Sequence, residues 1–148
     1  MITNEVYQDI QVLQNSDFTN VITFDDTHTM NSNMSYSAVI AKDKAHTAFT
    51  GPNKTSGTDG TQNNSDEWAS ASVNVVHFDL VADRSANNVT LTLPAEATQY
   101  FPDDFEGVWD LVEKDTSTGT VYIRQIQGDV VISAGASRLS DTFTASVA

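Results

Sequence analysis

The clearest indication of the fold comes from residues 89–94, whose sequence is VTLTLP. Val89, Leu91 and Leu93 alternate with two threonines, so an extended strand places the apolar side chains on one face and the threonines on the other. Pro94 cannot donate a backbone hydrogen bond and therefore ends the strand. This alternation predicts a half-buried strand with its apolar face against a core.

Similar short segments recur along the chain, and turn-forming residues separate them. Most are rich in β-branched or aromatic residues, as strands are. We expect strands over 6–12, 18–24, 35–41, 71–81, 89–93, 108–112, 120–126 and 130–133, a tight turn over 127–129, and one helical turn over 95–101. Strands at this spacing predict an all-β protein, an antiparallel β-sandwich of immunoglobulin-like or jelly-roll-like type.

The segment 71–81 differs from the other predicted strands because both of its faces are apolar. Val76, Phe78 and Leu80 line one face, and three further valines, Val81 among them, line the other. A strand of this kind belongs in the middle of a sheet or against a partner.

Two segments fall outside the strand pattern. Residues 51–66 are mostly glycine, serine, threonine and asparagine, which predicts a long polar loop. Residues 134–148 are small and mostly polar, which predicts a C-terminal arm. We therefore expect a single β-sandwich domain over residues 1–133, with the 51–66 loop as an insertion, followed by the arm at 134–148.

The chain carries 20 acidic and 7 basic residues, a formal net charge of -13 at pH 7. The basic residues are scattered, and only Lys42 and Lys44 lie close together in the sequence. Binding to nucleic acid or to an anionic membrane needs a basic surface. The sequence therefore predicts no nucleic-acid partner and no membrane partner.

Cysteine is absent, which excludes disulfides, thiol catalysis and metal sites built on cysteine. Residues 1–13 show neither the basic start nor the apolar run of a signal peptide. No apolar stretch approaches the length of a membrane span. We therefore expect the protein to be made and folded in a cytoplasm.

No combination of residues points to catalysis. His28, His46 and His77 lack the spacing of a zinc motif, and neither a nucleophile elbow nor a phosphate-binding glycine loop is present. The segment Pro102–Gly107 offers three carboxylates and a glycine without the EF-hand spacing, so we expect a turn before a strand there rather than a calcium site. We predict that the protein is not an enzyme and has no cofactor.

The two tryptophans lie in different sequence contexts. Trp109 lies between Val108 and Asp110 in a predicted strand, so we expect it in the core. Trp68 follows the polar loop, where two roles fit equally well, a lid on the core and a contact with a partner.

Two blocks of the sequence resemble a β-sandwich module of tailed bacteriophages, found in baseplate upper proteins, tail-fibre adaptors and other small virion proteins. The first block, YQDIQVLQ at 7–14 with Asp17-Phe18, resembles the opening strand and turn of this module. The second block resembles its closing meander and comprises FDL at 78–80, VTLTLP at 89–94, GVWDL at 107–111, VYIR at 121–124, GDVVI at 128–132 and Ser137-Arg138.

Two features depart from this module. Asn15 stands where the module usually has glycine, and the 51–66 insertion interrupts its middle. The strand count between residues 25 and 70 therefore stays open.

The resemblance implies a structural protein of a bacteriophage virion, made in the host cytoplasm, that holds neighbouring subunits together in the tail, baseplate or neck. Its partners would be other virion proteins and copies of itself in a homo-oligomer, joined by edge strands and arms. The candidate partner contacts are Trp68, Leu139, Phe143 and Val147.

Two alternatives stay open beside this interpretation. The first is a capsid decoration or cement protein, because likeness of fold does not fix a position in the particle. The second is a glycan- or receptor-binding module of a tail fibre, with Trp68 and the polar loop forming the site.

Overall fold

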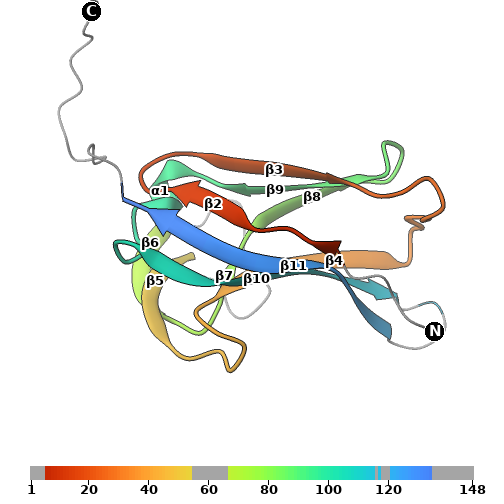
Figure 1. Cartoon of the computed structure of the whole chain (residues 1–148). Coiled ribbons are helices and arrows are strands. Elements are labelled where there is room, and N and C mark those ends of the chain that lie inside the picture. Colours follow the sequence, from red (N-terminus) through yellow and green to blue (C-terminus); the bar gives the residue numbers. More distant parts are fainter. Residues whose placement is uncertain (1–5, 55–66, 116, 118–120, 135–148) are drawn as a thin grey trace, which may run out of the picture.

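The structure is a computed structural model that describes residues 6–54, 67–115, 117 and 121–134 (Figure 1). Strands dominate this part of the chain, and its single α-helix is one turn long. In chain order the elements are β1 (Val6–Tyr7), β2 (Ile10–Leu13), β3 (Phe18–Thr23), β4 (Met34–Ala41), β5 (Phe49–Lys54), β6 (Trp68–Val73), β7 (Val76–His77), β8 (Asp79–Asp83), β9 (Asn88–Leu93), α1 (Ala95–Thr98), β10 (Phe105–Asp115) and β11 (Val121–Ser133). The prediction of an all-β protein is confirmed.

Two sheets pack face to face. The large sheet has the strand order β1-β11-β10-β4-β7, with β2 also paired to β11, and the small sheet has the order β3-β9-β8. The small sheet forms the upper layer in Figure 1. Strands pair antiparallel except at the N-terminus, where β1 and β2 run parallel to β11.

Of the two predicted sandwich types, this strand order matches the immunoglobulin-like one. In that fold one sheet carries strands B, E and D side by side, and the other carries C, F and G. The small sheet, β3-β9-β8, takes the B, E and D positions, and β4, β10 and β11 take C, F and G.

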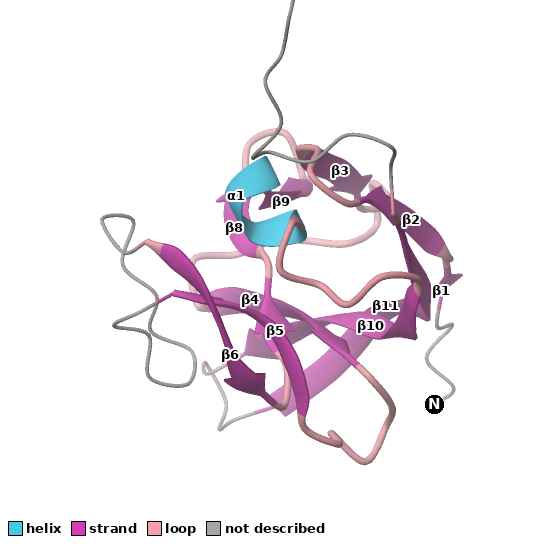
Figure 2. Ribbon diagram, turned by 90° about the vertical axis from the view of Figure 1, so that its left-hand side faces the viewer, coloured by secondary structure: helices cyan, strands magenta, loops and turns pink. Residues whose placement is uncertain are grey.

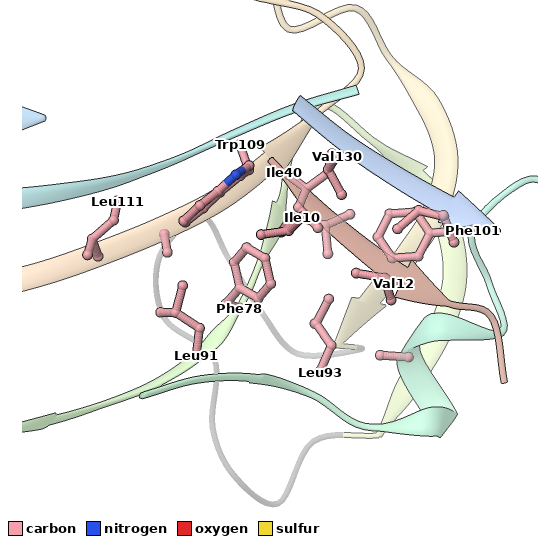
Figure 3. Packing of buried hydrophobic residues seen from close by; sticks show 14 of the residues in the cluster. Ile10, Val12, Ile40, Phe78, Leu91, Leu93, Phe101, Trp109, Leu111 and Val130 are labelled. Atoms are coloured by element: carbon pink, nitrogen blue, oxygen red, sulfur yellow. The ribbon is translucent and has the colours of Figure 1, made fainter. Parts of the chain in front are cut away.

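The core lies between the two sheets and combines their inward-facing side chains. Val89, Leu91 and Leu93 are fully buried, as the alternation in β9 predicts. Trp109 of β10 is 2% exposed, which confirms its predicted place in the core. Phe78 lies between Trp109 and Leu91 in Figure 3, and its ring meets the indole nearly edge-on at 6.2 Å between centroids.

The predicted turn at Gln127-Gly128-Asp129 is wrong, because these residues lie inside β11, which pairs with β10 on both sides of Gly128. The glycine serves a close approach of backbones instead. A Cβ atom on Gly128 would lie 2.0 Å from the carbonyl oxygen of Gln8, in the segment that joins β1 to β2. Gly-Asp therefore marks the place where the N-terminal segment passes β11, rather than a reversal of the chain.

Three predicted boundaries also need correction. The segment 6–12 forms two strands, interrupted at Gln8 and Asp9, and the segment 71–81 is divided among β6, β7 and β8. The predicted polar loop 51–66 begins too early, because Gly51 to Lys54 belong to β5. Residues 55–66 lie outside the described residues, as does the predicted arm from residue 135 onward.

The early start of the loop prediction has a physical cause. Gly51, Pro52 and Lys54 are poor strand formers, yet all three are buried in β5, which pairs with β6 in a separate hairpin. Gly51 is needed there, since a Cβ atom would lie 2.7 Å from the Phe49 ring. Packing against neighbouring elements therefore overrides local propensity in this strand.

One end of the sandwich is covered by the β5–β6 hairpin and by α1 (Figure 2). The predicted helical turn over 95–101 is present and spans Ala95–Thr98. The hydroxyl of Thr98 donates to the carbonyl of Ser16 at 2.9 Å, and the amide of Gln14 donates to the carbonyl of Phe101 at 2.7 Å. These bonds hold the turn after β2 against the helix.

Candidate functional site

Three surface features and one buried cluster are the candidates for function among the described residues. We call them the outer-sheet cleft, the Trp68 groove, the valine–threonine face and the Glu113 cluster.

The outer-sheet cleft is a hollow of about 380 Å³ on the outward face of the large sheet. It is lined by Tyr7, Asp9, Val39, Ala41, Asp43, Lys44, His46, Val108, Trp109, Asp110, Gln127, Gly128 and Asp129. Strand register explains this set, because Asp110 pairs with Val39 and with Gln127 in the strands on either side. Carboxylates from β10, β11 and the β1–β2 link thus surround an apolar patch.

A folded loop after β4 forms the other wall of this cleft. Asp43 shapes the loop by accepting a hydrogen bond from the backbone N–H of Thr47 at 3.0 Å. Hydrogen bonds from Thr47, the side-chain bond first, lower the pKa of Asp43 below its ordinary value. His46 follows in the left-handed region at φ 57°, a conformation that histidine adopts more readily than most residues.

The Trp68 groove is a more open hollow of about 570 Å³ at the covered end of the sandwich. It is lined by Lys54, Glu67, Trp68, Asp79, Pro94, Glu96, Gln99 and Tyr100. Lys54 is only 4% exposed, and its Nζ lies 3.0 Å from Oδ1 of Asp79 and 5.2 Å from the centre of the Trp68 ring. Trp68 is half-buried and packs against the core from the edge of this groove.

The valine–threonine face is the outward face of the small sheet. Val21 of β3 and Val81 of β8 both pair with Thr90 of β9, so the three residues form one row across the sheet. Val21 is 54% exposed and Val81 is 68% exposed. The row carries no charge. Each of the two flanking rows includes one carboxylate, because Asp79 pairs with Thr92 opposite Thr19 and Asp83 pairs with Asn88 opposite Thr23.

The exposure of Val81 excludes one of the two alternatives predicted for segment 71–81. A strand with two apolar faces was expected in the middle of a sheet or against a partner. Because β8 lies at the edge of the small sheet and Val81 points to solvent, the first alternative is wrong for this residue.

The Glu113 cluster lies inside the sandwich. Glu113 shares the inward face of β10 with Trp109 and Leu111 and is 1% exposed. Its Oε2 accepts a hydrogen bond from the hydroxyl of Tyr36 at 2.7 Å and lies 2.7 Å from Nε2 of His28. Sequence reasoning missed this cluster, although the odd-numbered positions of β10 share one face and could have placed Glu113 inward.

The pKa of Tyr36 responds to this surrounding. Burial of the phenol raises the pKa well above the ordinary 10.0, and the hydrogen bond to Glu113 and its negative charge raise it further. Arg84 acts weakly in the opposite direction. The cluster therefore holds the Tyr36 proton firmly and suits a structural role.

The described residues bring together no group of three or more histidine, aspartate or glutamate side chains that could hold a metal ion. In the segment Pro102–Gly107, residues 102–104 form a turn directly before β10, which begins at Phe105. The N–H of Phe105 donates to the carbonyl of Pro102 at 3.2 Å, and Asp104 adopts φ 55°. This confirms the predicted turn before a strand.

The predicted partner contacts have different outcomes. Trp68 borders a groove and is half-buried, which leaves its role as a contact a prediction. Leu139, Phe143 and Val147 lie outside the described residues.

No helix in the described part of the chain has the length and apolar character needed to cross a membrane. In comparisons with known proteins, no protein-family model matches the sequence and no curated protein matches it significantly.

Proposed function

We propose that the chain is a structural module of a bacteriophage virion that holds neighbouring subunits together in the tail, baseplate or neck. The sequence resemblance to phage β-sandwich modules motivates this proposal. The valine–threonine face is the structural observation that supports it best.

A row of exposed valines around Thr90 is unusual on a chain with a net charge of -13. Carboxylates keep most acidic proteins apart by like-charge repulsion. On the uncharged row itself another protein can pack without desolvating a charge, with the carboxylates of Asp79 and Asp83 in the flanking rows at the border of the contact.

Apolar side chains are also exposed at the other side of the sandwich. Tyr7, Leu13 and Val131, in β1, β2 and β11 of the large sheet, are exposed. The sandwich thus offers apolar contacts on both of its layers, as a subunit with neighbours on two sides would.

The size of the valine–threonine face limits what it can do alone. Three strands up to six residues long present a face of roughly 300 Å². A stable protein–protein interface buries about 800 Å² per partner. We therefore expect the isolated chain to be monomeric and to associate through several simultaneous contacts in a particle.

Immunogold electron microscopy of purified, washed particles tests the location. Antibodies against the chain should label the tail, baseplate or neck. Labelling of the capsid would replace this proposal with the cement-protein alternative, and unlabelled particles in which mass spectrometry also finds no such chain would refute a virion role.

A complementation assay tests the face itself. The double variant Val21→Glu/Val81→Glu should fold but fail to restore infectious particles to a phage lacking the gene. A matched control, Ser32→Glu/Ala48→Glu, adds the same charge at exposed positions elsewhere and should restore them. Equal titres from both variants would contradict a role for this face.

A further inference from the structure

We infer that the Trp68 groove binds a neutral, hydroxyl-rich ligand, an oligosaccharide. This inference goes beyond the structural role proposed above and does not depend on it. It rests on how the groove presents hydrogen-bonding groups beside aromatic rings.

The central observation is the Lys54 ammonium. A buried ammonium has three N–H donors and is costly to desolvate unless they are satisfied. Among the described residues, Lys54 forms one hydrogen bond, to Oδ1 of Asp79, and places its charge over the Trp68 ring. The remaining N–H donors of the ammonium must be satisfied by a ligand or by water in the groove.

Asp79 provides a hydrogen-bond acceptor next to the Lys54 donor. Its side chain is 34% exposed, and its hydrogen bond with Lys54 uses Oδ1. The groove therefore presents an N–H donor and a carboxylate acceptor side by side. Two adjacent sugar hydroxyls match such a pair, because each hydroxyl both donates and accepts.

The rest of the groove fits the same chemistry. Tyr100 and the part of Trp68 that stays exposed contribute aromatic surface beside which the C–H groups of a sugar ring can pack. Gln99 uses its amide N–H on the carbonyl of Glu96 at 3.1 Å, which orients its side-chain oxygen as an acceptor. Lys54 covers one face of the indole and so holds the ring in position.

The charge of the groove selects against anionic ligands. Glu67, Asp79 and Glu96 outnumber Lys54, so the groove and the whole chain repel anionic ligands such as phosphate or acidic sugars. The same excess of carboxylates would attract a basic peptide, so charge alone does not exclude one. The donor–acceptor pair of Lys54 and Asp79 beside aromatic rings favours a sugar, and a lysine-rich peptide is titrated alongside the sugars as the competing outcome.

The test uses the two tryptophans as site and internal control. The full ¹⁵N-labelled chain is titrated with maltotriose, cellotriose and triacetylchitotriose up to about 10 mM, which detects millimolar dissociation constants. We expect at least one trisaccharide to shift the indole N–H signal of Trp68. The chemical shift of the Trp109 indole N–H should not change, since that indole is 2% exposed and donates to the carbonyl of Gln8 at 2.7 Å.

Variants then assign the effect to the groove. Lys54→Met and, at the rim of the groove, Gln99→Ala should each weaken binding at least fivefold, whereas Tyr7→Ala in the outer-sheet cleft should leave it unchanged. Gln99→Ala keeps the test decisive if Lys54→Met does not fold.

Three results would overturn the inference. These are no Trp68 shift with any trisaccharide, equal shifts of both indoles, or a Trp68 shift produced only by a lysine-rich peptide. None of them bears on whether the chain is found in virions, so this inference and the proposed function can fail separately.

Discussion

Glu113 and Lys54 are buried ionisable side chains of opposite charge, and the sandwich surrounds them differently. Glu113 is 1% exposed and Lys54 is 4% exposed, so neither charge is well hydrated. Glu113 is surrounded by donors from two other segments, Tyr36 and His28. Among the described residues Lys54 has one carboxylate partner, Asp79, which borders an open groove.

The difference lies in what completes each site. The protein's own side chains provide the hydrogen-bond donors for the Glu113 carboxylate. Removing Glu113 would leave Tyr36 and His28 without their shared acceptor. The Lys54 site is completed from outside, because Asp79 can be hydrated or can bind a ligand. A closed polar site stabilises the fold, and an open one is available for recognition.

The largest effect on stability should come from removing the closed charge. We expect Glu113→Ala to lower the free energy of unfolding by about 3 kcal/mol, the usual cost of breaking a buried pair. Urea denaturation followed by circular dichroism measures it. The control Glu106→Ala, at an exposed position of the same strand, should change stability by less than about 0.5 kcal/mol. A cost below about 1 kcal/mol for Glu113→Ala would mean that the cluster is not closed.

The next largest loss of stability should come from replacing Tyr36. Tyr36→Phe removes a hydrogen bond to a charged group and should cost about 2 kcal/mol at pH 7. The exposed-site control Tyr7→Phe should cost less than about 0.5 kcal/mol. Similar costs for the two variants would contradict the assigned role of Tyr36.

The same residue predicts how stability changes at alkaline pH. The folded-state pKa of Tyr36 is raised above the ordinary 10.0, so its contribution is complete below pH 10 and is lost as the pH rises beyond it. The reason is that the unfolded chain releases this proton while the folded chain keeps it. Thermal melts between pH 9 and 11 should fall less steeply for Tyr36→Phe than for the parent chain.

The open charge should matter less for stability. Lys54→Met keeps an unbranched apolar side chain beside Trp68 and leaves Asp79 partly hydrated. We expect a loss of about 1 kcal/mol by urea denaturation, well below that of Glu113→Ala. Equal losses for the two variants would remove the distinction between the closed and open sites.

The smallest effect should come from the exposed valines, which take part in neither charged site. Val81→Thr keeps a β-branched side chain on the strand and should change the free energy of unfolding by less than about 0.5 kcal/mol. A larger loss in urea denaturation would show that this face contributes to the fold rather than to contacts with a partner.

The class of fold and much of the core follow from the residue pattern alone. Alternation places Val89, Leu91 and Leu93 inward whatever their partners are, because side chains of a strand point to opposite faces in turn. The same rule, with the surrounding apolar residues, placed Trp109 correctly. These features are local, so the order of residues is enough to predict them.

The candidate sites, in contrast, depend on contacts between segments that are distant in the sequence. Lys54 meets Asp79 across 25 residues and Glu113 meets His28 across 85, and no local pattern encodes such distances. Gly128 was misread for the same reason, since the backbone that requires a glycine there belongs to Gln8, at the other end of the chain. Polar sites and close backbone approaches depend on which strands become neighbours, and packing of the whole domain sets that order.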